Sequence, residues 1–104
     1  MSADKIRALN DGFRRSFTGG KVMTTAGVAA LPDAVRVVVL EEVRKFDAFT
    51  GDNDPHGEHD FGGFEIDGRK ILWKIDLYEE PGVKGADDLP LTTRVLTIML
   101  AEEW

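Results

Sequence analysis

The ionisable side chains that could do chemistry are concentrated in residues 52–60. This stretch holds both histidines of the chain and four of its carboxylates. Its members are Asp52, Asp54, His56, Glu58, His59 and Asp60. Imidazoles beside carboxylates can bind a divalent cation, exchange protons, or hydrogen-bond the backbone of a tight loop. The segment is therefore the candidate functional site, and its spacing alone leaves these three roles open.

A metal site is the first reading of this segment. The pattern begins like a calcium-binding loop, with acids at the first and third positions and Gly57 at the sixth, but its twelfth position is Gly63 where a bidentate Glu is needed. A transition-metal site with two nitrogens and one carboxylate fits better. Its ligands would be His56, His59 and either Asp54 or Asp60. Because three ligands from one short loop must still converge, the sequence leaves the metal question open.

Acid/base hydrolysis and a purely structural turn are the other two readings. Hydrolysis needs a general base, which His59 with Asp60 or Asp76 could supply, but the sequence holds no nucleophile elbow, phosphate-binding loop or metalloprotease motif. Asx turns, Pro55 and Gly57 would instead specify a tight connection between helix and sheet. A rigid loop of this kind can present a recognition surface. We therefore assign no catalytic residue and expect no cofactor.

The charge of the chain is unevenly distributed. Residues 1–50 carry a net charge of +2 and residues 51–104 a net charge of −8, which gives −6 for the whole sequence. Nucleic-acid affinity depends on cationic neutralisation of phosphates, so direct binding of DNA or RNA is disfavoured. An acidic face is attracted to basic surfaces. The expected partner is therefore a protein with a basic surface.

Composition predicts one compact domain over residues 1–104, because 42% of the residues are hydrophobic. The absence of cysteine excludes disulfides and thiolate chemistry. No segment has the length and apolar character of a membrane span, and the N-terminal residues lack the features of a signal peptide. We expect a cytoplasmic protein without membrane contacts.

Two amphipathic helices are predicted in the first half of the chain. The first has Ser2 as its N-cap and an apolar stripe, with Arg7, Arg14 and Arg15 off that stripe. The stripe consists of Ile6, Leu9, Phe13 and Phe17. Residues 21–25 have the composition of a strand. The second helix follows a start signal at Leu31-Pro32-Asp33, and its apolar face consists of Val35, Val38, Val39, Val43 and Phe46.

The sequence period changes from helix-like to strand-like after the histidine-rich segment. Residues 61–66 and 70–78 form a predicted hairpin around Asp67-Gly68. A Pro/Gly/Asp loop is predicted over 79–90, and 93–101 reads as a central strand because it is apolar on both faces. The predicted fold class is α+β, with two N-terminal helices packed on a small, mainly antiparallel sheet made of the hairpin and the C-terminal strand. The expected core residues of the sheet are Trp73, Ile75, Leu96 and Ile98.

Two polar residues, Asp76 and Arg94, lie inside otherwise apolar predicted strands. Asp76 could face solvent or pair with Lys74 or Arg94. The two strand residues would be satisfied most cheaply by each other or by the adjacent polar loop. We therefore predict one shared network at the mouth of the sheet. The predicted binding residues are Asp54, His56, Glu58, His59, Asp60, Asp76 and Arg94.

Several stretches of the sequence carry a resemblance to a known family. They are Phe46-Asp47-Ala48-Phe49 and residues 53–62, 73–78 and 93–101, with Leu9-Asn10-Asp11 and Arg14 upstream. This pattern resembles the bacterial family catalogued as domain of unknown function 3768, over nearly the whole chain. The resemblance implies a small single-domain protein, often carried by alphaproteobacteria and their plasmids or phages, and the family name assigns no activity. Relatives tend to end with Tyr where this chain has Trp104.

The functional expectation combines size, acidity and the incomplete catalytic motifs. These favour a small, acidic, non-enzymatic interaction or regulatory protein that occupies a basic protein surface. An example would be an inhibitor that is encoded on a mobile element and acts on a host system. The alternative is a metal-dependent or acid/base hydrolase centred on residues 52–60. Neither a target nor a substrate follows from the sequence.

Overall fold

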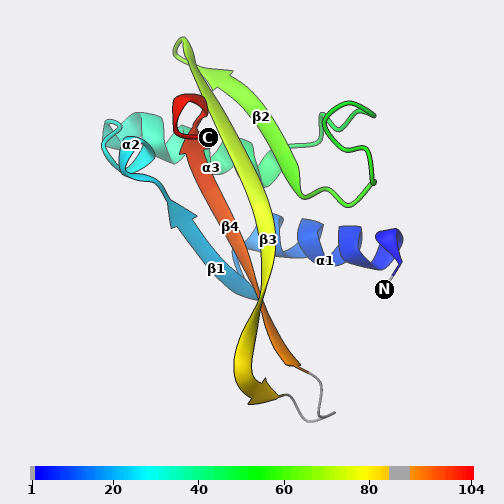
Figure 1. The fold of residues 1–104 in the computed structure, drawn as a ribbon. Helices are drawn as coiled ribbons and strands as arrows, with labels where there is room; N and C mark the ends of the chain where they lie inside the picture. Colours follow the sequence, from blue (N-terminus) through cyan, green and yellow to red (C-terminus); the bar gives the residue numbers. More distant parts are fainter. Residues whose placement is uncertain (1, 85–89) are drawn as a thin grey trace.

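The computed structural model describes residues 2–84 and 90–104, which adopt an α+β fold built on a four-stranded sheet (Figure 1). The helices are α1 (Ala3–Ser16), α2 (Ala26–Ala29) and α3 (Asp33–Lys45). The strands are β1 (Gly20–Thr24), β2 (Phe61–Ile66), β3 (Arg69–Lys84) and β4 (Pro90–Leu100), and the 3-10 turn η1 (Ala101–Glu103) follows β4. The strand order is β1-β4-β3-β2, with β1 parallel to β4 and the other pairs antiparallel. The predicted fold class is thus confirmed.

The two long helices begin where local chemistry predicts. Helix α1 starts after Ser2, whose Oγ accepts a hydrogen bond from the Lys5 backbone N–H at 3.4 Å, and it ends at Phe17, which takes a left-handed conformation. Helix α3 starts directly after Pro32. The sequence did not predict the short helix α2, because Gly27 reads as a break. Helix α2 nevertheless places Val28 in the core with no exposed surface.

The core lies between the sheet and the helices α1 and α3, which cross the same face of the sheet in Figure 1. The four predicted core residues of the sheet, Trp73, Ile75, Leu96 and Ile98, are all buried as expected. The Trp73 ring meets the Phe46 ring edge to face at 5.5 Å. Burial of these large side chains supplies the main stabilisation of the fold.

The β2–β3 hairpin turns at Asp67 and Gly68, which both have positive φ as a tight two-residue turn requires. The loop predicted over 79–90 is wrong in part, since β3 continues to Lys84 and β4 begins at Pro90; residues 85–89 of that prediction lie outside the described residues. Pairing with the neighbouring strand outweighs the Pro/Gly composition here, with one irregularity in register. Figure 1 shows β3 and β4 extending together beyond the other strands.

Within residues 2–84 and 90–104, no helix combines the length and the apolar character needed to cross a bilayer.

Candidate functional site

Residues 50–60, called the acidic loop below, form a structured turn between α3 and β2. The Asn53 side chain closes the turn by accepting a hydrogen bond from the Thr50 N–H at 2.8 Å and donating one to the Ala48 carbonyl at 3.0 Å. Gly57 has a positive φ, and its N–H donates to the Asp54 carbonyl at 3.1 Å. A specified turn is therefore present, as the sequence predicts, but the Asn53 side chain bonds to the backbone that precedes it and not to the N–H two residues on, as an Asx turn would require.

The Asp54 carboxylate organises the second half of the acidic loop from inside. Its side chain is only 6% exposed, and its Oδ1 accepts hydrogen bonds from the backbone N–H groups of Glu58 and His59, both at 3.1 Å. These bonds hold His59 at a φ of 53°, a left-handed conformation that costs a non-glycine residue about 1–2 kcal/mol. The loop therefore tolerates local strain in order to aim the His59 ring.

The His59 ring is enclosed on both edges and on one face. Its Nδ1 lies 2.9 Å and 3.1 Å from the two carboxylate oxygens of Asp11, and its Nε2 lies 3.6 Å from Oδ2 of Asp54. The Phe49 ring stacks on it with 3.7 Å between centroids and 3° between planes. Each ring nitrogen thus faces a carboxylate, one from α1 and one from the loop itself.

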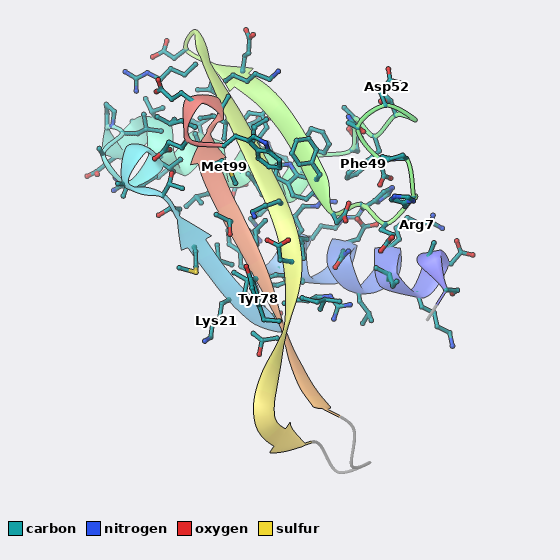
Figure 2. All side chains as sticks on the ribbon, viewed as in Figure 1. Arg7, Lys21, Phe49, Asp52, Tyr78 and Met99 are labelled. Atoms are coloured by element: carbon teal, nitrogen blue, oxygen red, sulfur yellow. The ribbon has the colours of Figure 1, made fainter. Side chains whose placement is uncertain are left out.

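Helix α1 holds the acidic loop through further side chains on the same face. Arg7 donates from Nη1 to the Gly57 carbonyl, and Asn10 donates from Nδ2 to the Glu58 carbonyl, each at 3.0 Å. The Asn10 oxygen in turn accepts a hydrogen bond from Nε of Arg94 at 3.0 Å. Figure 2 shows the Arg7 side chain beside the green loop that carries Asp52 at its far side. One helix face therefore connects the loop to strand β4.

Arg14 anchors the other end of this network and has no exposed surface. It donates to the carbonyls of Val43 and Arg44 at 2.9 Å and 3.1 Å, and to Oδ1 of Asp11 at 3.0 Å. The sequence pattern placed Arg14 off the apolar stripe, which would leave it exposed. It is buried instead between the C-terminal carbonyls of α3 and the Trp73 ring, whose centroid lies 5.1 Å from Cζ of Arg14. Burial lowers the pKa of Arg14, and the hydrogen bond that Arg14 donates to the Asp11 carboxylate opposes that shift.

The structure brings together only some of the predicted site residues. Asp54, the Glu58 backbone and His59 form one network, as expected. His56 is exposed to solvent instead. Asp60 is partly buried, and its carbonyl accepts the Ile75 N–H at 2.8 Å, which joins the end of the loop to β3.

The prediction that Asp76 and Arg94 contact each other is wrong. The prediction that Asp76 joins the loop network is also wrong. In the β3–β4 register, Asp76 is opposite Val95 and Arg94 is opposite Leu77. Successive side chains on a strand point to opposite faces, so the two residues lie on different sides of the sheet. Asp76 pairs with Lys74 at 3.1 Å on the face without long helices, whereas Arg94 reaches the network through Asn10.

The geometry limits what the cluster formed by Asp11, Asp54 and His59, with their neighbours on α1, can do chemically. Among the described residues, no group of three His, Asp or Glu side chains is arranged to hold a metal ion. The His59 ring separates the carboxylates of Asp11 and Asp54, so these groups do not converge on one point. The Asp11–His59 pair has the form of an oriented general base, but the Nε2 that would take a proton from a nucleophile faces Asp54.

Sequence reasoning missed the α1 half of this cluster. The missed residues are Arg7, Asn10, Asp11 and Arg14 on α1, together with Phe49. The four polar residues follow the three- and four-residue spacing of a helix face, which is a signal for a second, polar stripe. That signal shows that the side chains share a face, but it does not name the segment that packs on it.

The fold and the cluster define a small α+β protein in which polar side chains bind a histidine-containing acidic loop onto the N-terminal helix. The family model described as Protein of unknown function (DUF3768) matches residues 24–103, so the chain belongs to this family. The match contains the acidic loop and strands β2 to β4, and it excludes α1. No curated protein and no solved structure matches the chain significantly.

Proposed function

We propose that this protein is a non-enzymatic binding or regulatory protein whose acidic loop recognises a basic surface on another protein. The supporting observation is that both nitrogens of His59 face carboxylates and that the buried Asp54 carboxylate accepts two backbone N–H groups. These groups are engaged in positioning the loop. Of the remaining acids of the loop, Asp52 is exposed and Glu58 and Asp60 are partly exposed, so the loop presents negative charge to solvent.

The pairing of charges supports this choice of surface. On the helices, three exposed acids pair with an arginine three residues along the chain, in Asp4–Arg7, Asp33–Arg36 and Glu41–Arg44. Exposed Glu42 forms no ion pair among the described side chains. Among the side chains that the structure describes, the loop acids form no such ion pair. These acids are Asp52, Glu58 and Asp60. Unpaired carboxylates on a rigid loop attract a cationic partner at little further cost in conformational entropy.

The partner in this proposal is a basic host protein, such as one that itself binds nucleic acid, and the chain makes no direct nucleic-acid or membrane contact. An accessory protein encoded on a plasmid or phage and acting in the cytoplasm would fit this role as an inhibitor. Occupation of the partner's basic surface would block that surface electrostatically and sterically.

Affinity capture from the native host with matched charge variants tests this proposal. The loop variant D52N/D60N and the α3 variant E41Q/E42Q each remove two negative charges. We expect wild type and E41Q/E42Q to recover the same basic partner at low salt. We expect about a tenfold weaker complex with D52N/D60N, since two charge contacts of about 0.5–1 kcal/mol each are lost. High salt should weaken the wild-type complex. Equal recovery by both variants would refute the role of the loop.

The Asp11–His59 pair is the one observation that favours the alternative, an acid/base or metal-dependent hydrolase. Hydrolysis of nitrophenyl esters and phosphate esters, with and without added divalent metal, tests it. Turnover that both His59→Asn and Asp11→Asn abolish would establish an enzyme and displace the binding proposal. The binding proposal predicts no turnover above that of a buffer control.

A further inference from the structure

A hollow of about 550 Å³ adjoins the acidic loop on the sheet face that carries no long helix. Its walls include Phe61, Leu72 and Trp104. Phe61 is opposite Lys74 in the β2–β3 register, and therefore points away from the face on which Trp73 is buried. The hollow thus lies outside the core.

The aromatic wall of this hollow is exposed although it is preorganised. Trp104 is 71% exposed, and its ring meets the Phe61 ring edge to face at 5.5 Å. Lys74 lies 5.9 Å from the centroid of the Trp104 ring. An exposed indole held by a neighbouring ring and a cation loses little conformational freedom when an apolar group covers it. These features suit insertion of an aromatic or large aliphatic side chain.

The hollow is continuous with the surface assigned above to a basic partner. Asn53, which closes the acidic loop, also lines the hollow. Glu65 and Glu102 are exposed near this region and form no ion pair among the described side chains, whereas Lys70 is a cation in the lining. Charges of both signs therefore border the apolar centre. Lys70 lines the hollow and Lys74 lies against Trp104, whereas exposed carboxylates lie on Glu65, on Glu102 and on the acidic loop.

We propose that the hollow takes an aromatic or large aliphatic side chain from the same basic polypeptide segment that the acidic loop attracts. This inference rests on the proposed function and adds the chemistry of the partner: cationic residues flank an apolar anchor. The acids guide and orient the segment, and the anchor supplies most of the affinity. Trp104 is then a binding residue, although it lies far from residues 52–60 in the sequence.

Selection of twelve-residue random peptides displayed on phage against the whole protein tests the inference. We expect enriched peptides to combine Lys or Arg with an aromatic or large aliphatic residue. A chosen peptide should bind Trp104→Ala at least about tenfold more weakly than wild type, since a truncated anchor contact costs more than about 1 kcal/mol. It should bind Val37→Ala like wild type, because Val37 is an exposed apolar residue on α3 and lines none of this surface.

Two further readouts separate binding from folding and separate this inference from the proposed function. Peptide binding should shift the fluorescence of wild type to shorter wavelength, because Trp73 is already buried and Trp104 is the indole that becomes covered. Basic peptides without an apolar anchor that bind Trp104→Ala and wild type equally would overturn this inference and leave the proposed function standing. Peptides without Lys or Arg that bind D52N/D60N as well as wild type would overturn both.

Discussion

Replacement of His59 by alanine should destabilise the fold by removing the side chain that joins the acidic loop to α1. The loss of a hydrogen bond to a carboxylate costs about 1.5–3 kcal/mol, and the loss of a stacked aromatic contact about 0.5–1.5 kcal/mol. The His59 side chain is 23% exposed, so solvent screening reduces the first contribution. We expect the free energy of unfolding to fall by about 2–3 kcal/mol.

Urea unfolding of a double-mutant cycle measures this effect. The cycle compares wild type, His59→Ala, Asp11→Ala and the double variant, and it should give a coupling energy of about 1–2 kcal/mol between the two side chains. His56→Ala is the matched control, because this histidine of the same loop is exposed and should cost less than about 0.5 kcal/mol. Equal stabilities for the His59 and His56 variants, or a coupling energy near zero, would refute the proposed network.

Three further substitutions test other parts of the structure. Gly62→Ala would place its Cβ 2.6 Å from a buried indole nitrogen and should cost about 1–3 kcal/mol in thermal or urea unfolding, whereas Gly51→Ala meets no atom within 4 Å and should be neutral. Hydrogen bonds lower the pKa of Glu103 below its ordinary value of 4.5, and the bond donated by the Thr25 hydroxyl has the largest effect. The charged side chain therefore stabilises the fold above pH 4.5, and this contribution is lost as the pH falls through the pKa of the folded state. Glu103→Gln should therefore lower the melting temperature at pH 7, and the difference from wild type should close at acid pH; a constant difference would contradict the assignment. Arg14→Met should lower the free energy of unfolding by about 3 kcal/mol, because it leaves helix carbonyls and a carboxylate without their partner; wild-type stability would contradict this.

Local sequence signals predicted much of the fold. The N-cap Ser2, the turn at Asp67-Gly68 and the apolar positions that bury Trp73 and Ile98 each act through neighbouring residues. Such signals need only the period of a helix or strand and the chemistry of a turn. The family resemblance inferred from the sequence agrees with the family match.

The half of the candidate site that the sequence did not predict depends on contacts between residues far apart in the chain. Asp11 and His59 are 48 positions apart, and no local pattern pairs them. The burial of Arg14 depends on the place where α3 ends, because carbonyls there accept its hydrogen bonds. The separation of Asp76 from Arg94 depends on strand register, since a shift of one residue moves every side chain of a strand to the other face of the sheet. These features follow from tertiary packing, which the sequence pattern leaves undetermined.

Hydrogen–deuterium exchange of the acidic loop tests most directly whether these polar residues hold the loop onto α1. The backbone amides of Glu58 and His59 donate to Asp54 and should be protected in wild type. In Asp11→Ala they should exchange about tenfold faster, while amides in the centre of β3, such as that of Trp73, keep their protection. Loop amides that exchange freely in wild type, or that keep full protection in Asp11→Ala, would contradict this role for the network.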